Sequence, residues 1–296
     1  MINITFLGTS SMIPTPERNH NSILISYKNH GILVDCGEGT QRQLRIARIK
    51  PSKITKLLIT HWHGDHVLGI PGLIQNLAAH NSKNTLDIYG PKGSKKYLKN
   101  MLSGIVVQEK VKYEVKELSS GVFYKNDFIL EALPLDHITP CLAYSFKERD
   151  SRKINLGYTK KFGLTRHPLL GNLQRGKDIV YKGKKIQASK ATTLIKGKKI
   201  AIVMDTAPTK NAVKIAKDSD ILITEATWSK ELEKFVMKRK HLTAELAAKI
   251  AKQANAKKLI LTHFSQRYKD IKQLETEAKK VFKNTVLAED FMQINI

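Results

Sequence analysis

The sequence predicts a mixed α/β protein in which two β-sheets pack face to face and helices cover their outer surfaces. The chain has 296 residues, and 41% of them are hydrophobic, which is enough to bury a core in one large domain or two small ones. Short β-branched and aliphatic runs alternate with amphipathic stretches in both halves of the chain. Because this periodicity also fits one open α/β sheet, that alternative stays open.

The first half of the chain holds most of the expected strands. They are predicted from short hydrophobic runs, and the helices are predicted from apolar residues at helical spacing. The expected strands cover residues 2–7, 23–27, 31–34, 56–60, 86–89, 112–118, 128–133 and 142–146. The expected helices cover residues 38–48, residues 93–102 and a segment after His66 that carries Leu68, Leu73 and Leu77.

A Gly-, Pro- and Lys-rich segment interrupts this pattern from residue 147 to about residue 190. An insertion of this length without clear core periodicity is either functional or disordered. Regular α/β alternation then resumes, with strands expected at residues 199–204, 221–224 and 258–262 and helices expected after Pro208 and at residues 243–253. The insertion therefore interrupts one domain and does not separate two.

The charge balance indicates a polyanionic partner. Lys and Arg total 51 and Asp and Glu total 26, which gives a formal net charge of +25. Such a surplus favours a polyanionic partner over a small neutral one, although a generally lysine-rich proteome would also produce many lysines. No apolar run reaches the roughly 20 residues that span a bilayer, so we expect a soluble, cytoplasmic protein without membrane contact. Cys36 and Cys141 are the only cysteines, and we expect both to be reduced packing residues.

Four side chains that can bind a metal follow the expected strand at residues 56–60. They are His61, His63, Asp65 and His66, and we place them on the loop before the next helix. Imidazole and carboxylate groups suit zinc and similar divalent ions, and alternate residues of an extended segment point the same way. His61 and His63 can therefore share one ion, which leaves Asp65 and His66 for a second. A surface His-rich loop is the alternative explanation of this cluster.

Three further candidate ligands lie where hydrophobic strands end. His137 follows one strand, Asp205 directly follows the strand at residues 199–204, and His263 directly follows the strand at residues 258–262. Functional side chains in layered α/β folds often lie at such strand ends. Any one of these residues alone is more often a structural polar residue, but together with the His61 cluster they complete two coordination shells.

The positions of these candidate ligands resemble the motifs of the metallo-β-lactamase superfamily, which has five. Asp35, within Leu33-Val-Asp-Cys-Gly37, is similar to its first motif, and the segment from His61 to His66 is similar to its second. His137, Asp205 and His263 are similar to the third, fourth and fifth motifs. The resemblance implies a four-layer αββα sandwich and two zinc ions, although other divalent metals such as manganese could replace zinc. By the same resemblance, one zinc takes His61, His63 and His137, the other takes Asp65, His66 and His263, and Asp205 bridges them; Asp35 orients the His61 loop.

Four further segments resemble the RNase Z family of tRNA 3′-processing endoribonucleases. Residues 14–19 are similar to its substrate loop, with Pro16 where the family usually has Lys. Thr224-Glu-Ala-Thr227 is similar to its His-Glu-Ala-Thr loop, and His241-Leu-Thr243 is similar to its His-Ser-Thr loop. The insertion, taken as residues 150–188, resembles the family's flexible arm, with His167-Pro168 in place of a Gly-Pro element. The likeness covers nearly the whole chain as a single domain with this arm inserted.

The resemblance implies a zinc-dependent endoribonuclease that cuts precursor tRNA near the discriminator base and releases a 5′-phosphorylated trailer. Asp65 would orient the attacking water or accept its proton, and His241, held by Glu225, would protonate the leaving 3′ oxygen. The resemblance also implies a homodimer in which the arm of one subunit serves the other. The expected RNA contacts are Arg18, Asn19, Ser265 and Arg267 in the domain and Lys160, Lys161, Arg166 and Arg175 in the arm.

Two other functions remain open at the level of sequence. A different hydrolase of the superfamily, acting on a small phosphodiester or thioester, would use the same metal cluster and would not need a basic arm. A non-catalytic RNA-binding relative would use the same basic surface and would have no need for Asp65 and Asp205. An RNA-degrading nuclease of the superfamily carries an extra domain, for which the chain is too short.

Overall fold

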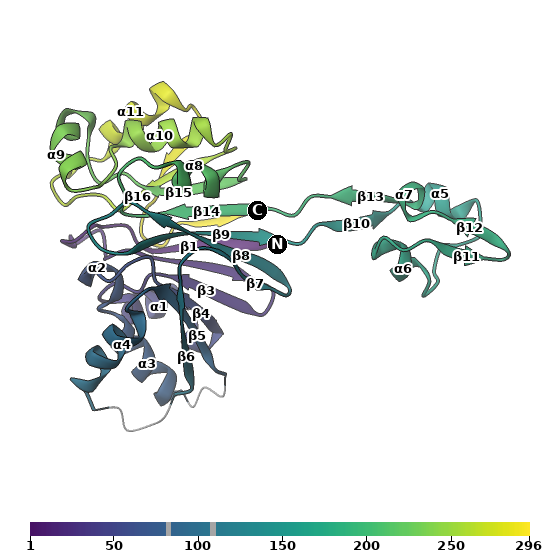
Figure 1. Cartoon of the computed structure of the whole chain (residues 1–296), viewed down its shortest axis with the longest axis horizontal. Coiled ribbons are helices and arrows are strands. Elements are labelled where there is room, and N and C mark those ends of the chain that lie inside the picture. Colours follow the sequence, from purple (N-terminus) through teal and green to yellow (C-terminus); the bar gives the residue numbers. More distant parts are fainter. Residues whose placement is uncertain (81–83, 107–110) are drawn as a thin grey trace. The chain divides into compact units, whose positions relative to one another are not determined.

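The computed structural model describes residues 1–80, 84–106 and 111–296 of the chain. The chain divides into two compact units (Figure 1). The main unit contains Met1–Tyr124, Leu130–Phe146 and Lys199–Ile296, and the inserted unit contains Lys125–Ile129 and Lys147–Lys198. In the described part of the chain, no helix is both long enough and apolar enough to cross a membrane.

The first large sheet has seven strands and is built mainly by the first 118 residues. Its strand order is β18 (Gln293–Asn295), β1 (Ile2–Gly8), β2 (Ser22–Tyr27), β3 (His30–Val34), β4 (Ile54–Leu58), β5 (Leu86–Pro91) and β6 (Tyr113–Leu118). Strands β1 to β3 pair antiparallel, whereas β3 to β6 pair parallel. Parallel neighbours need crossover segments, and these contain α1 (Thr40–Ile46), η1 (Pro51–Lys53), α2 (Gly64–Val67), α3 (Ile70–Ala79) and α4 (Ser94–Ser103).

The second large sheet also has seven strands. Its order is β17 (Thr285–Leu287), β16 (Leu259–Thr262), β15 (Ile221–Glu225), β14 (Lys199–Val203), β9 (Cys141–Glu148), β8 (Phe128–Leu135) and β7 (Gly121–Lys125). Strands β14 to β17 are parallel. Their connections contain α8 (Lys210–Ala216), η2 (Lys230–Leu232), α9 (Glu233–Lys238), α10 (Ala244–Gln253) and α11 (Lys272–Val281).

The two sheets pack face to face, and helices cover their outer faces (Figure 1). Leu259 and Leu261 of β16 belong to the same buried cluster as the apolar face of α10, while the intervening Ile260 is buried on the opposite face of its strand. Between the sheets, the rings of Tyr27 and Phe146 lie 5.4 Å apart, and the Tyr144 hydroxyl donates to the Ile59 carbonyl at 2.7 Å. The two-sheet arrangement is therefore confirmed, and the single open sheet is excluded.

The expected elements of the main unit occur with small shifts at their ends, and one placement was wrong. Asp65 and His66 do not lie on a loop, because they belong to the short helix α2. Gly69 separates α2 from α3, so Leu68 lies outside α3 and is 54% exposed, whereas Leu73 is buried in the core. Strands β7, β17 and β18 and helices α9 and α11 were not predicted, since most of them are short or mainly polar.

The inserted unit is ordered and has a core of its own. Strand β10 (Ser151–Ile154) pairs antiparallel with β13 (Thr192–Ile195), and β11 (Ile179–Tyr181) forms a hairpin with β12 (Lys184–Ile186). Three short helices, α5 (Leu156–Lys160), α6 (Leu170–Gln174) and α7 (Ala188–Ala191), complete the unit. Its buried core consists of Leu164, Leu173, Ile179, Ile186, Ala188 and Ala191. These residues are too widely spaced in the chain to produce a readable period, which explains why the sequence did not predict the core.

Candidate metal centre

A cavity of about 370 Å³ opens where several strands of both sheets end. His63, Asp65, His137, Asp205 and His263 line it, while His61 and His66 are fully buried beneath. The seven candidate ligands predicted from the sequence are therefore brought together, although more than 200 residues separate His61 from His263.

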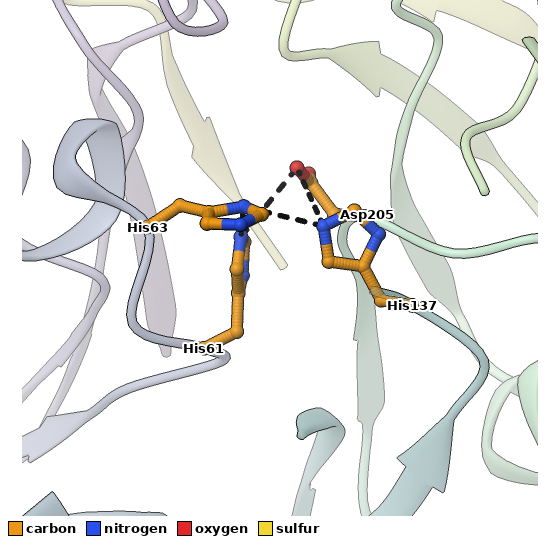
Figure 2. Close-up of side chains that lie close together, drawn as sticks. All are labelled: His61, His63, His137 and Asp205. Atoms are coloured by element: carbon orange, nitrogen blue, oxygen red, sulfur yellow. Dashed lines mark hydrogen bonds and ion pairs between the residues drawn. The ribbon is translucent and has the colours of Figure 1, made fainter. Parts of the chain in front are cut away.

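Four of these side chains form the first group: His61, His63, His137 and Asp205 (Figure 2). The Nε2 atom of His61 lies 3.0 Å from Nδ1 of His63, and Nε2 of His137 lies 3.3 Å from the same Nδ1. The Asp205 carboxylate faces them, with Oδ2 3.6 Å from His61 Nε2 and 4.0 Å from His137 Nε2. One atom from each residue could thus contact a single ion.

The second group contains Asp65, His66 and His263. Their contacting atoms are mutually close, since His66 Nε2 lies 3.2 Å from His263 Nε2 and each of these nitrogens lies 3.3 Å from Asp65 Oδ2. Asp205 faces this group as well, because its Oδ1 lies 3.3 Å from His263 Nε2. Oδ2 of Asp205 lies 3.6 Å from His61 Nε2 and 3.7 Å from His66 Nε2, so the carboxylate lies between the two groups and could contact an ion in either.

Hydrogen bonds at the far side of four rings orient their nitrogens toward the cavity. In His61, His66, His137 and His263, Nδ1 contacts an oxygen acceptor, so a proton on Nδ1 leaves the lone pair on Nε2. The acceptors are Thr60 Oγ1 at 3.1 Å, Asp35 Oδ2 at 2.7 Å, the Lys240 carbonyl at 3.0 Å and Thr227 Oγ1 at 3.0 Å, respectively. Only His63 presents Nδ1 to the group, because its Nδ1 is the atom near His61 and His137.

The residues fit a pair of divalent cations. Imidazole lone pairs that converge at about 3 Å repel one another unless a proton or a cation lies between them. Asp65 Oδ1 and Asp205 Oδ1 are buried and have no hydrogen-bond donor, which is costly for carboxylate oxygens unless a cation or a water molecule binds them. Nitrogen and oxygen ligands of this kind suit zinc, with manganese as an alternative.

Asp35 supports the His61 loop from below. Its buried carboxylate accepts hydrogen bonds from the Thr60 backbone N–H at 2.8 Å, from Asn21 Nδ2 at 3.0 Å and from His66 Nδ1 at 2.7 Å. The backbone of Asp35 has φ 59° and that of His263 has φ 60°, a left-handed conformation that costs a non-glycine residue about 1–3 kcal/mol. The fold therefore maintains local strain at two positions of the site.

At His61, His63, His137 and Asp65 the electrostatic surroundings favour the protonation states that a cation needs, whereas at His66 they favour the charged form. Burial, together with the neighbouring imidazoles, lowers the pKa of His61, His63 and His137, so these rings stay neutral. Burial raises the pKa of Asp65, but the charges of His66 and His263 outweigh it and hold that pKa well below the usual range. Burial also opposes the charged form of His66, yet the nearby carboxylates raise its pKa well above the ordinary value. A divalent cation would neutralise the same carboxylates.

His241, which is partly exposed, and Glu225, which is fully buried, form a pair beside the second group. His241 Nδ1 lies 3.0 Å from Glu225 Oε2 and 3.7 Å from Asp205 Oδ2. Glu225 is fixed by the Thr206 backbone N–H at 2.8 Å and by the Thr227 hydroxyl at 2.5 Å. Burial lowers the pKa of His241, but Glu225 and Asp205 outweigh this and raise it to about 9. His241 thus favours the imidazolium form and can donate a proton from Nε2.

The expected RNA contacts are divided among three places. Ser265 lines the cavity, and Arg267 lies two residues further on with its guanidinium over the Trp228 ring. Arg18 is buried, donates to the Tyr268 carbonyl at 2.9 Å and lines a different cavity. Asn19 Nδ2 donates to the Glu38 carbonyl at 2.8 Å. The four arm residues, Lys160, Lys161, Arg166 and Arg175, are exposed in the inserted unit.

The sequence did not single out several residues that line the cavity. Met12, Ile13 and Ile138 lie at its edge and are 51–67% exposed, and Trp228 and Arg239 also contribute to its wall. Exposed apolar residues in loops carry no period, so pattern alone could not have found them.

Curated relatives match the chain along its full length. The ribonuclease Z of Archaeoglobus fulgidus is 39% identical over 303 residues, covering 100% of this chain and 98% of that protein. The ribonuclease Z of Methanothermobacter thermautotrophicus is 36% identical and covers 100% of this chain and 97% of its own. This chain belongs to the ribonuclease Z family.

Solved structures agree with that ribonuclease Z assignment. Human tRNase Z, short form, is 28% identical with a TM-score of 0.72 and covers 99% of both chains. The metallo-β-lactamase fold protein YhfI from Bacillus subtilis, at 18% identity and a TM-score of 0.72, confirms the fold alone. A family model described as Anti-Pycsar protein Apyc1 matches residues 2–157. That match includes His61 and His137 but ends before Asp205, Glu225 and His263.

Proposed function

We propose that this chain is a metal-dependent endoribonuclease that cuts precursor tRNA near the discriminator base. The cut leaves a 3′-hydroxyl on the tRNA and a 5′-phosphate on the trailer. The observation that supports this most directly is the position of Asp205 between the two groups, with carboxylate oxygens 3.6 Å from His61 Nε2 and 3.3 Å from His263 Nε2. Full-length relatives named ribonuclease Z support the substrate. The expected cytoplasmic location is part of the same proposal.

The proposed cofactor is a pair of zinc ions. His61, His63 and His137 would hold one, Asp65, His66 and His263 would hold the other, and Asp205 would contact both. When bound, two such ions lower the pKa of a water from about 15.7 toward about 7 and neutralise charge on the phosphate oxygens.

The protein side chains supply the proton transfers. Asp65 lines the cavity and has a free Oδ1, so it can orient the attacking water and accept its proton. His241 lines the same cavity in a form that favours a proton on both nitrogens, so Nε2 can protonate the leaving 3′ oxygen. Glu225 holds His241 by Nδ1 and keeps Nε2 directed away from the Glu225 carboxylate. Asp65 acts on the attacking water and His241 acts on the leaving group, so experiments can test the two residues separately.

The inserted unit is proposed to act as an RNA-binding exosite within a homodimer. Its exposed Lys160, Lys161, Arg166 and Arg175 can neutralise phosphates, and contacts of this kind weaken as salt rises. Recognition by the shape of the tRNA needs a rigid surface, and the separate core of the inserted unit provides one. Sedimentation velocity at several concentrations tests the dimer, since a monomer at every concentration would exclude it.

One comparison separates this function from the two alternatives. Purified protein is incubated with end-labelled precursor tRNA and with generic single-stranded RNA, with and without a chelator. The proposal expects one sharp cut beside the acceptor stem that the chelator abolishes. Hydrolysis of a small phosphodiester or thioester without tRNA cleavage would favour the small-substrate hydrolase. RNA binding without any cleavage after metal reconstitution would favour the non-catalytic relative.

A further inference from the structure

Two arginines and two aromatic rings form a continuous stack beside the cavity. The Arg239 guanidinium carbon lies 4.8 Å from the centre of the Phe235 ring, and the Arg267 guanidinium carbon lies 4.9 Å from the centre of the Trp228 ring. The two rings meet edge to face, with centroids 5.5 Å apart and an interplanar angle of 78°. The stack joins three segments: helix α9 and its end, the loop after β15 and the loop after His263.

The guanidinium groups of this stack are oriented but not neutralised. Both arginines are exposed, and neither forms an ion pair in the described part of the chain. Stacking on an aromatic face fixes the plane of a guanidinium and leaves the N–H groups along its edge available. Those N–H groups match the spacing of two phosphate oxygens, so a stacked arginine suits bidentate phosphate binding.

The aromatic members are placed for positioning and not for core packing. Phe235 is 42% exposed, although an aromatic ring gains most from complete burial. The Trp228 Nε1 atom is buried without a hydrogen-bond partner, so ring contacts and not a hydrogen bond fix this indole. Each ring therefore presents a face that holds one of the two guanidinium groups.

The stack lies at the site of the proposed cleavage. Trp228 and Arg239 line the same cavity as Asp65, Asp205 and His241. Arg267 follows Ser265 and Gln266, which also line that cavity. A single-stranded RNA segment that enters the cavity would bring one phosphate to the candidate metal centre and further phosphates to its edge.

We infer that Arg239 and Arg267 bind the phosphates next to the scissile phosphate, and that Phe235 and Trp228 are positioning residues for these two arginines. The inference rests on the proposed function. It adds Arg239 and the two rings to Arg267, which is the one member of the stack among the RNA contacts expected from the sequence. The ligand is the sugar-phosphate backbone of single-stranded RNA, so the stack recognises charge and spacing and not a base sequence.

The first test compares Arg239→Ala with the parent protein on precursor tRNA. Losing one charge-assisted contact should raise KM by roughly tenfold and leave kcat within about two-fold. The slope of log KM against log salt should fall by about 1. The double variant Arg239→Ala/Arg267→Ala should lower that slope by about 2. A parental KM and salt slope for Arg239→Ala would overturn the inference.

Two further substitutions, at Arg239 and at Trp228, distinguish the effect of an oriented guanidinium from the effect of positive charge alone. Arg239→Lys keeps the charge but loses the planar fork, so it should recover less than half of the lost affinity in logarithmic units. Trp228→Ala should raise KM by at least as much as Arg267→Ala does. Trp228→Phe keeps an aromatic face, so its KM should lie close to the parental value. Full rescue by Arg239→Lys, or no rescue by Trp228→Phe in a folded protein with parental metal content, would contradict the positioning role.

The control is Arg45→Ala, which removes an exposed arginine of α1 that does not line the cavity. It should leave KM and the salt slope unchanged. Failure of the parent protein to cut precursor tRNA would refute the proposed function itself. If the parent cuts and Arg239→Ala behaves like Arg45→Ala, only the inference about the stack is refuted.

Discussion

Asp205 contacts His263 at 3.3 Å through Oδ1, while its other oxygen, Oδ2, lies 3.6 Å from His61. One carboxylate thus joins ligand groups from both ends of the chain. We predict that Asp205→Asn lowers the bound metal from about two ions per chain to one or none, because the amide has no charge and only one oxygen acceptor. Elemental analysis of dialysed protein gives the metal content. Two ions retained at parental affinity would show that Asp205 does not bridge.

Asp65→Ala should reduce single-turnover cleavage of precursor tRNA by at least about a thousandfold, since it removes both a candidate ligand and the group that orients the water. RNA binding should remain within about two-fold, because the phosphate contacts are elsewhere. Filter binding and quench-flow cleavage measure the two quantities. Parental cleavage at full metal content would refute the mechanism.

His241→Ala should affect cleavage according to the leaving group. Precursor tRNA, whose leaving 3′ oxygen needs a proton, should be cut about a hundredfold more slowly. In a tRNA precursor with sulfur in place of that bridging 3′ oxygen, the 3′ sulfur leaves readily as a thiolate without a proton. The cleavage rate of this substrate should therefore fall much less. Glu225→Gln should show the same pattern more weakly, since Glu225 only holds the ring. Equal losses on the oxygen and sulfur substrates would exclude a proton donor at position 241.

Replacing residues 155–191 by an Asn-Gly turn should separate RNA recognition from chemistry. Ile154 of β10 pairs with Thr192 of β13, so a two-residue hairpin can join the two strands directly. The KM for precursor tRNA should rise about tenfold or more as phosphate contacts are lost, while hydrolysis of bis(p-nitrophenyl) phosphate should stay within about two-fold. The two buried clusters of the main unit contain no deleted residue, so it should stay folded. An equal loss on both substrates would argue against an exosite.

Both cysteines should resist alkylation in the folded protein. Burial raises the pKa of Cys36 to about 12, and burial with the nearby carboxylates raises the pKa of Cys141 well above its ordinary value. Because only the thiolate reacts, labelling by iodoacetamide at pH 8 should be at least about a thousandfold slower than for free cysteine and should accelerate as pH rises. Mass spectrometry of the protein before and after denaturation in guanidinium measures the extent of labelling. Rapid labelling of the native protein at pH 8 would show that one of the thiols is accessible.

The amino-acid sequence by itself determined most strands and helices of the main unit and the identity of the seven candidate ligands. Strand periodicity is local, and His61, Asp205 and His263 each follow a hydrophobic run, so a reader of the chain could find them. It also indicated an inserted segment but not its fold. The six core residues of that segment lie between residues 164 and 191 without a regular period.

Only the tertiary structure decided how these parts meet. It placed Asp65 and His66 on a helix and Asp205 between the two groups, and it directed Nε2 of four histidines toward the cavity through partners such as Asp35 and the Lys240 carbonyl. It also brought Phe235 and Trp228 between two arginines. These relationships depend on packing between segments that are distant in the chain, and neither local propensity nor hydrophobic period contains that information.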